Sequence, residues 1–314
     1  MTIPAEADIA AAAERIAPFV RHTPVLRLAG AELGTPGDVV LKLELLQHAG
    51  SFKPRGAFNR ILTAQAAGEL PAAGLIAASG GNHGAAVAYA ARVLGLSAEI
   101  FIPELTPPAK RARIESFGAR LVQTGETYAE ALEASRVRQA ETGAMEVHAF
   151  EHPTILAGQG TTALEFEQDA PELTHVLVAT GGGGLIGGMA AWYRGRTKLI
   201  SVEPAACPAL HDALAAGGPV TAPVGGVAAD SLGSRRVGEL MFPLAQAFIE
   251  EAVLVSDDAI RAAQRLLWDR LRLVAEPGGA TALAALISKA WTQPKDARVG
   301  VLVCGSNTDP ATVV

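Results

Sequence analysis

Apolar and polar positions follow two alternating patterns in the middle of the chain. Short apolar runs are followed by longer stretches whose apolar residues recur every three or four positions. The runs predict strands and the stretches predict helices. The expected strands are 75–78, 98–102, 120–123 and 146–150, and the expected helices are 82–94, 108–117 and 127–142. Such alternation predicts a parallel sheet with helices on both faces.

The same alternation continues in the regions on either side. Helices are expected at 6–20, 57–67, 153–168 and 208–216, with another ending at 192, and strands at 39–45, 175–179, 198–203, 251–255 and 298–304. The fold class predicted is α/β, with two domains that each hold a mainly parallel sheet flanked by helices. Residues 1–73 and 151–314 are expected to form the large domain, and residues 74–150 a small inserted α/β domain.

Composition narrows the class of protein further. The chain has 314 residues, 49% of them hydrophobic, and a net charge of -6. This charge gives no reason to expect nucleic acid or an anionic membrane as a partner, and no apolar run is long enough for a spanning helix. The N-terminus lacks the basic and apolar regions of a signal peptide, and Cys207 and Cys304 are far apart. We expect a cytoplasmic protein.

One lysine stands at a predicted helix start, between small and turn-forming residues. Lys53 directly precedes Pro54, which fits the first turn of a helix. A cation at this position opposes the positive end of the helix macrodipole, so the neutral amine is favoured. Such an amine can form an imine with a carbonyl compound, because only the free amine attacks. The alternative is a solvated lysine that happens to begin a helix.

A run of four glycines at 181–184 follows a predicted strand and precedes a predicted helix. This arrangement directs backbone N–H groups toward an anion such as a phosphate. The glycine spacing from Gly182 to Gly187 also satisfies the dinucleotide fingerprint, and Glu203 stands where a ribose-binding acid is expected. An NAD-dependent oxidoreductase is therefore an alternative, although it leaves Lys53 unexplained.

Three motifs together resemble those of one enzyme family. The sequence SFKPRGA at 51–57 is similar to the S-F-K-x-R-G-A motif of the pyridoxal-phosphate (PLP) enzymes of the serine/threonine dehydratase family, which includes serine racemase. The sequence SGGNHG at 79–84 resembles that family's S-x-G-N-H loop, and GGGGL at 181–185 resembles its phosphate-binding loop. The motifs occur in the family's order and spacing, and further matches extend from Arg21 to Asn307.

The resemblance implies a fold-type-II PLP enzyme, similar to the tryptophan synthase β chain, and assigns roles to residues. Lys53 would bind the cofactor as a Schiff base and, as a free amine, remove the substrate's α-proton. Asn82 would bind the cofactor's 3-hydroxyl group. The implied cofactor-binding residues are Phe52, Lys53, Asn82, Gly181, Gly182, Gly183, Gly184, Leu185 and Cys304. The implied binding residues for the substrate's carboxylate are Ser79, Gly80, Gly81 and His83.

The position expected at the pyridine nitrogen departs from the family. Much of the family has serine where this chain has Cys304. A thiol is a weak neutral donor and cannot hold a full pyridinium charge as an aspartate would. A ring that withdraws electrons less strongly favours β-elimination over transamination. Ser306 could also reach the nitrogen, a buried apolar role stays open for Cys304, and a structural role stays open for His83.

Two other departures concern racemisation and metal binding. Serine racemases resemble this chain but have a serine at Gly80, and glycine offers no second base, so little racemase activity is expected. Glu203 aligns with the start of the family's divalent-cation site, but Ala209 replaces the partnering carboxylate. One carboxylate is a poor site for a hard cation, so no metal is predicted and Glu203 is a weak candidate. Glu276 is a second family-like acid near the expected cofactor pocket.

These features predict a homodimeric lyase that removes water and then ammonia from L-threonine or L-serine and releases a 2-oxo acid. Within the same fold, the alternatives are an amino-acid racemase and a β-replacement synthase such as cysteine synthase. The synthases resemble T-S-G-N-T-G at the asparagine loop, whereas this chain has His83. A PLP-binding protein without enzyme activity is a further alternative. The stretch 225–231 is expected to contribute to the substrate pocket and does not separate threonine from serine.

Overall fold

The apolar runs of the two flanking regions assemble into one six-stranded sheet. In the computed structural model, which describes residues 2–313, the strand order is β1-β2-β10-β7-β8-β9. The strands are β1 (Val25–Leu28), β2 (Val39–Lys42), β7 (His175–Ala179), β8 (Lys198–Pro204), β9 (Ile249–Val255) and β10 (Val299–Leu302). Strand β1 is antiparallel to β2, and the other pairs are parallel. The central strands β2, β7 and β10 are buried throughout, as parallel strands covered on both faces should be.

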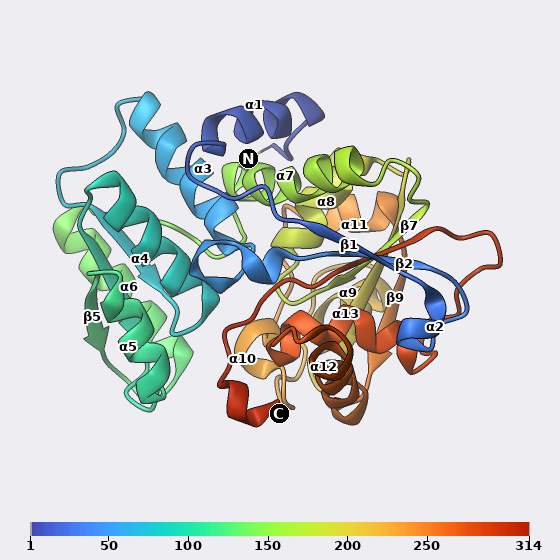
Figure 1. The fold of residues 1–314 in the computed structure, drawn as a ribbon. Coiled ribbons are helices and arrows are strands. Elements are labelled where there is room, and N and C mark those ends of the chain that lie inside the picture. The colour runs from blue at the N-terminus through green and yellow to red at the C-terminus, as the bar shows by residue number, and fades with distance from the viewer. Residues whose placement is uncertain (1, 314) are drawn as a thin grey trace.

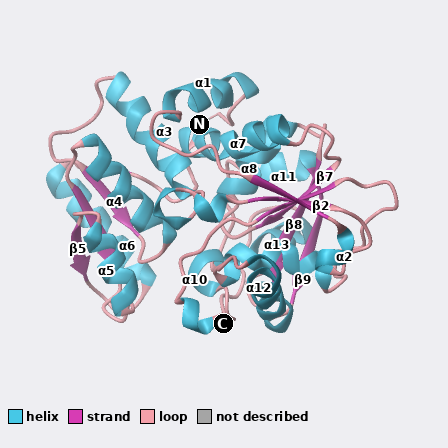
Figure 2. Ribbon diagram, viewed as in Figure 1, coloured by secondary structure: helices cyan, strands magenta, loops and turns pink. Residues whose placement is uncertain are grey.

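Helices cover both faces of this sheet (Figures 1 and 2). In the view of Figure 1, α7 and α8 lie above the sheet, and α12 and α13 lie below it. The helices of this region are α1 (Glu6–Ile16), α2 (Gly30–Leu33), α3 (Lys53–Ala66), α7 (Pro153–Asp169), α8 (Gly184–Tyr193), α9 (Ala209–Ala216), α10 (Ala229–Leu232), α11 (Phe242–Phe248), α12 (Asp257–Leu271) and α13 (Pro277–Ile287). Short 3-10 turns occur at Glu44–Leu46, His48–Gly50 and Pro310–Thr312. Among the described residues, no helix combines the length and apolar character needed to cross a membrane.

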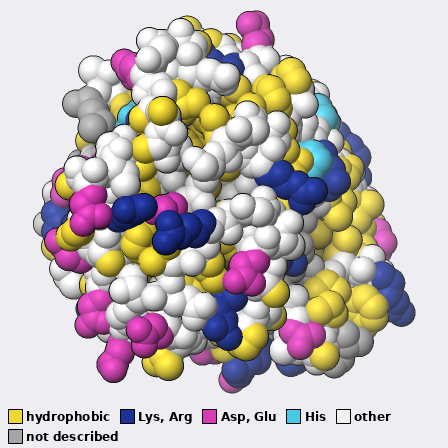
Figure 3. Space-filling model, turned by 90° about the vertical axis from the view of Figure 1, so that its left-hand side faces the viewer, with side chains coloured by type: hydrophobic (Ala, Val, Ile, Leu, Met, Phe, Trp, Pro, Cys, Tyr) yellow, Lys and Arg dark blue, Asp and Glu magenta, His cyan; other side chains and the backbone are white. Residues whose placement is uncertain are grey.

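A second, smaller sheet is built from the middle of the chain. Its four strands are parallel and run in the order β5-β4-β3-β6. They are β3 (Leu75–Ala78), β4 (Ala98–Ile102), β5 (Arg120–Gln123) and β6 (Met145–Glu146), accompanied by the helices α4 (Asn82–Leu94), α5 (Pro108–Ser116) and α6 (Tyr128–Thr142). On this side of the molecule, acidic and basic side chains are interspersed rather than gathered by sign (Figure 3).

Most of the predicted elements are confirmed with errors at their ends, whereas β1, α2, α10 and α11 were not predicted. The strands at 75–78, 98–102, 120–123 and 175–179 and the helix at 82–94 occupy the predicted residues. The expected strand at 146–150 is limited to Met145–Glu146, because the chain leaves the sheet there toward α7. Helix α3 begins at Lys53, as Pro54 in its first turn predicted, and it therefore extends the expected range 57–67 toward the N-terminus.

The boundaries expected for the inserted domain, 74–150, stay a prediction. The strands of the smaller sheet all lie within this range. Its hydrophobic core, however, also includes Phe58 and Ile61 from α3, which precedes the range. Helix α3 therefore connects the two sheets and carries Lys53 at its first residue.

Candidate active site

The predicted motifs meet where strands of the larger sheet end. Strands β2, β7 and β10 are neighbours and parallel, so the segments after them lie at one edge of the sheet. Ligands bind at this edge in open α/β sheets. The pocket here is lined by Phe52, Lys53, Asn82, Phe150, Ala179, Thr180, Gly181, Gly182, Gly183, Gly184, Leu185, Ile186, Ser231, Leu232, Glu276 and Cys304.

Lys53 presents its amine to this pocket. Its Nζ donates a hydrogen bond to the carbonyl oxygen of Ala149 (3.0 Å) and lies 5.1 Å from the centre of the Phe52 ring. Burial lowers the pKa of Lys53 to about 8, although Cys304 and Glu276 oppose the shift. The sequence pointed to the helix N-terminus as the cause of a lowered pKa, whereas burial is the main one. The amine is thus partly neutral near pH 8.

The loop before Lys53 is held by the segment that follows β10. The backbone N–H of Phe52 donates to the carbonyl of Cys304 (3.2 Å), and the N–H of Ser306 donates to the carbonyl of Gly50 (2.8 Å). The Oγ of Ser306 donates to the carbonyl of Leu45 (3.1 Å). These bonds fix the entry into α3 and therefore the place of Lys53.

Asn82 is the first residue of α4 and brings the smaller sheet to the pocket. Its Nδ2 donates to Oε1 of Glu276 (2.6 Å), and its Oδ1 accepts from Nδ2 of Asn307 (2.6 Å). Burial raises the pKa of Glu276 to about 7, and the hydrogen bond from Asn82 opposes that rise. Asn82 is therefore held in one orientation by partners from two other segments.

The other residues expected to bind the substrate's carboxylate lie at the start of α4. Among the residues that the structure describes, those that line the pocket do not include Ser79, Gly80, Gly81 or His83. The Nε2 of His83 lies 2.6 Å from the carbonyl of Val147, so its N–H donates there. Burial lowers the pKa of His83 to about 3, which leaves the ring neutral. This geometry favours the structural role that the sequence left open for His83.

The glycine loop packs too closely against its neighbours for side chains. A β-carbon at Gly182 would collide with the ring of Phe150, and one at Gly184 would lie 2.7 Å from Cβ of Phe150. Gly183 has a φ of 87°, in the left-handed region that favours glycine. The loop leads directly into α8, whose first N–H groups have no partners within the helix. The loop and helix start together suit a phosphate group.

Cys304 is buried at the pocket wall. Its Sγ donates to the carbonyl of Gly278 at 3.5 Å, the long distance expected of a weak thiol donor. Burial raises the pKa of Cys304, so the thiol is neutral. Cys304 thus combines the two possibilities that the sequence left open, because it is a buried residue just after the core strand β10 and also lines the pocket.

Glu203 lies outside the pocket. Its two carboxylate oxygens accept hydrogen bonds from the N–H groups of Leu210 and His211, both at 2.7 Å, at the start of α9. The carboxylate is buried, which raises the pKa of Glu203 to about 7. The geometry supports a helix contact for Glu203, which was only a weak candidate for a metal ligand. It also removes the ribose-binding acid that the dinucleotide alternative needs.

A buried cluster of charges was not anticipated from the sequence. Nζ of Lys42 lies 2.6 Å from Oε1 of Glu165 and 2.7 Å from Oδ2 of Asp169. The Arg55 guanidinium binds both oxygens of Glu44 (2.7 and 2.9 Å) and also Glu165 (3.0 Å). Burial alone would raise the pKa of Glu165, but Arg55 and Lys42 more than offset this and hold it below its ordinary value. Every charge in the cluster therefore has a partner.

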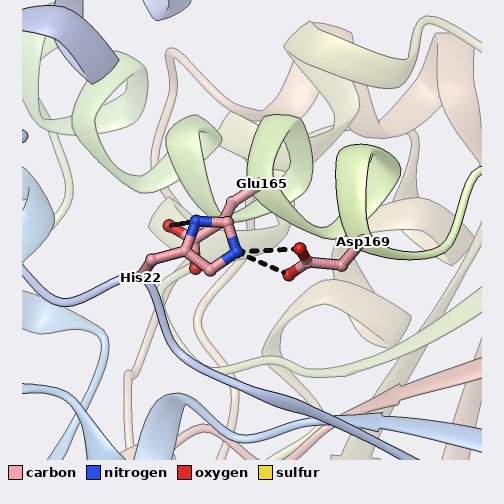
Figure 4. A group of neighbouring side chains, drawn as sticks. All are labelled: His22, Glu165 and Asp169. Carbon is pink, nitrogen blue, oxygen red and sulfur yellow. Dashed lines mark hydrogen bonds and ion pairs between the residues drawn. The ribbon is translucent and has the colours of Figure 1, made fainter.

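His22 completes this cluster at the surface. Its Nε2 lies 2.8 Å from Oδ1 of Asp169, and its Nδ1 lies 3.9 Å from Oε2 of Glu165 (Figure 4). The three side chains are close enough to share a metal ion. The two carboxylates, however, already bind the ammonium group of Lys42, which supplies the positive charge that they require.

Comparison with known proteins identifies the family. A sequence model of the pyridoxal-phosphate dependent enzymes matches residues 16–305. The chain belongs to this family. It is 40% identical to the L-threonine ammonia-lyase of Geobacter sulfurreducens over 285 residues, which cover 90% of this chain and 70% of that protein. It is 38% identical to the phenylserine dehydratase of Ralstonia pickettii, covering 99% of this chain and 95% of that one.

Solved structures support the same family. The structure of maize serine racemase superposes with a TM-score of 0.92 at 31% identity, covering 98% of this chain and 95% of that chain. The predicted fold-type-II α/β architecture and the PLP cofactor are confirmed by these relationships.

The pocket fits a PLP cofactor on its own geometry. The glycine loop and the start of α8 provide N–H groups that suit a phosphate, and the close approach of Phe150 to Gly182 and Gly184 leaves no room for side chains in this loop. Lys53 supplies an amine with a lowered pKa, as a carbonyl compound requires. Asn82 lines the same pocket with a side-chain amide. The residues present thus match the phosphate, the aldehyde and the polar ring substituents of that group.

Proposed function

We propose that this family member is an ammonia-lyase that removes water and then ammonia from a 3-hydroxy amino acid, L-threonine or L-serine, and releases a 2-oxo acid. The observation that carries the proposal is the amine of Lys53, with its lowered pKa, in one pocket with the glycine loop. The extended similarity to an L-threonine ammonia-lyase supports the choice of reaction.

The cofactor is assigned to residues that line the pocket. Lys53 would hold its aldehyde carbon, Asn82 would bind its 3-hydroxyl group, and Cys304 would offer a neutral thiol to its ring nitrogen. The phosphate binds to the N–H groups of 181–185, with Phe52 beside the lysine. When bound, PLP withdraws electrons from the substrate's α-carbon and so stabilises negative charge there.

The protein's own groups orient the substrate and move its proton. As a free amine, the Nζ of Lys53 would be the base that takes the α-proton. The first N–H groups of α4 suit the α-carboxylate because they have no partner within the helix and lie at its positive end, whereas the N–H groups of Ser79 and Gly81 just before it already donate to Phe101 and to the hydroxyl of Ser79. The side chain of Ser231, from the stretch expected to shape the substrate pocket, lines the same space.

Racemisation is the main alternative within the family. A racemase needs a second base on the face of the α-carbon opposite Lys53, and Gly80 has no side chain to supply one. A β-carbon at Gly80 would lie 3.1 Å from Cγ2 of Thr106, so a larger residue there would press on its neighbour. We therefore propose a lyase that forms D-serine far more slowly than pyruvate, and chiral chromatography of the serine reaction measures both.

Domain boundaries, location and assembly are also proposals. The small domain, 74–150, is supported by the separate sheet within it. A cytoplasmic location is supported by Cys207 and Cys304, which are both buried and unpaired. A homodimer rests on the family resemblance, and the mass of the protein in solution tests it. The net charge of -6 supports a small-molecule substrate and gives no support for nucleic acid.

The substrate is tested by mixing the PLP-loaded protein separately with L-threonine, L-serine and L-phenylserine and measuring 2-oxo acid and ammonia. Phenylserine is included because a phenylserine dehydratase is 38% identical to this chain. The proposal predicts equal amounts of 2-oxo acid and ammonia from threonine or serine. Release from phenylserine alone would correct the substrate, and NAD-dependent oxidation without any ammonia would contradict the reaction.

A further inference from the structure

Asn307 lies where three distant segments of the chain meet. Its Nδ2 donates one hydrogen bond to the carbonyl of Ala49 (2.8 Å) and another to Oδ1 of Asn82 (2.6 Å). The Nδ2 of Asn82 donates in turn to Oε1 of Glu276 (2.6 Å). Two amides and a carboxyl group therefore form one relay that begins at a backbone carbonyl.

The backbone carbonyl sets the direction of this relay. The oxygen of Ala49 can only accept a hydrogen bond, so Asn307 must turn its NH2 group toward it. The same NH2 group then faces Asn82, which must present its oxygen. The NH2 group of Asn82 is left facing Glu276. Flipping Asn307 would bring its oxygen against two acceptor oxygens, and flipping Asn82 alone would bring two NH2 groups together.

The loop that carries Lys53 is shaped around Asn307. Ala49 has a φ of 56° and Gly50 a φ of 73°, so two successive residues take the left-handed conformation. A β-carbon at Gly50 would collide with Oδ1 of Asn307. The close approach of this amide therefore depends on glycine at position 50, and it ties the lysine loop to the relay.

The relay leaves one N–H of Asn82 available. Its NH2 group carries two protons, and Glu276 accepts one of them. Among the described residues, no acceptor binds the second proton, and Asn82 lines the pocket. We propose that Asn307 is a positioning residue that orients the amide of Asn82 and so directs its second N–H to the cofactor. This inference rests on the assignment of Asn82 under the proposed function.

The test is the affinity of the apoprotein for PLP, measured by titration in a double-mutant cycle. Asn82→Ala and Asn307→Ala should each raise the dissociation constant by about tenfold, the effect of roughly one hydrogen bond. If Asn307 acts through Asn82, the double variant should bind no more weakly than Asn82→Ala alone. Effects that multiply would overturn the inference, because Asn307 would then act independently.

Two further variants keep the test sharp. Asn307→Asp preserves the shape of the side chain but cannot donate, so it should weaken PLP binding and change the visible spectrum of the bound cofactor as Asn82→Ala does. Thr308→Ala removes from the same segment a hydroxyl that pairs with the hydroxyl of Thr312 (3.3 Å) and leaves the relay intact, so its dissociation constant should stay within about twofold of wild type.

The outcomes distinguish a failure of the relay from a failure of the assignment of Asn82 to the cofactor. If Asn82→Ala binds PLP with unchanged affinity and spectrum, the assignment of Asn82 fails. If Asn82→Ala weakens binding and Asn307→Asp does not, only the relay fails. Thermal unfolding of each apoprotein identifies any variant that does not fold, and the remaining Asn307 variant then completes the comparison.

Discussion

Lys42 is buried and Lys53 is half-buried, and the groups around the two amines differ. Lys42 is completely buried, and its ammonium group has two carboxylates and the carbonyl of Thr23 as partners. Lys53 donates to one carbonyl and has no carboxylate within ion-pair distance among the described residues. Burial therefore lowers the pKa of Lys53 to about 8. A buried lysine is kept as a stable cation by its partners, and a lysine without such partners becomes a reactive amine.

The two regions are joined through the first turn of α3. Arg55 lies two residues after Lys53 and is bound to Glu44 and Glu165 in the charge cluster. The cluster anchors the start of the helix from one side, and the amine of Lys53 lies in the pocket on the other. Within one motif, Arg55 therefore contributes to stability, and Lys53, two residues earlier, supplies the reactive amine.

The largest expected effect is that of removing the pocket lysine. Lys53→Ala should lower the rate of 2-oxo acid formation by at least about a thousandfold, because the proposed acceptor of the α-proton is lost. The same variant should unfold at a urea concentration close to that of wild type. Lys198→Ala, which removes an exposed lysine paired with Glu250, is the control and should keep full activity.

Breaking the charge cluster should affect stability instead. Arg55→Met leaves the carboxylates of Glu44 and Glu165 without their guanidinium partner, which should cost about 3–5 kcal/mol in the free energy of unfolding. Urea unfolding measures this change. Lys198→Ala, whose ion pair is exposed, should cost less than about 1 kcal/mol. Equal losses in the two variants would show that burial of the cluster is energetically unimportant.

Replacing Glu276 should change the free energy of unfolding less than Arg55→Met does, and in the opposite direction. Its pKa in the folded protein, about 7, is above its ordinary value of 4.5, so its contribution to stability is present below pH 4.5 and is lost as pH rises to 7. Glu276→Gln does not titrate and keeps an oxygen for Asn82. We compare the free energy of unfolding of the variant with that of wild type, both as apoproteins. On going from pH 4 to pH 8, this difference should shift by about 1–3 kcal/mol in favour of the variant. A pH-independent difference in urea unfolding would contradict the raised pKa.

The pH dependence of cofactor attachment tests Lys53 itself. Because its pKa is about 8, the rate at which the apoprotein binds PLP covalently should fall by about tenfold per pH unit below 8 and level off above it. Stopped-flow absorbance measures this rate. A rate that still rises toward pH 10 would indicate a lysine with an ordinary pKa.

The features that were predicted from the sequence have local causes. Pro54 indicates where α3 begins, and the glycines at 181–184 indicate a close backbone approach, so the lysine and the glycine loop could be placed before the fold was known. The central strands are buried on both faces and therefore appear as continuous apolar runs. Strand β1 was missed because it is a short edge strand with an exposed Arg27 in its centre.

The remaining features depend on contacts between distant residues. Asn82 is separated from Glu276 by 194 positions and from Asn307 by 225, so no local pattern links them. The same holds for Lys42 and Glu165, which are 123 positions apart. The lowered pKa of Lys53 was expected from the helix dipole, but its main cause is burial, which depends on the packing of the whole pocket.

The central claim is that the unpaired lysine, and not the paired one, binds the cofactor. The most direct test is to reduce the PLP-loaded protein with borohydride, digest it, and map the attached pyridoxyl group by mass spectrometry. The account predicts that the label is on Lys53 and that Lys42 is unmodified. A label on Lys42, or a protein that binds PLP but carries no label on Lys53, would contradict it.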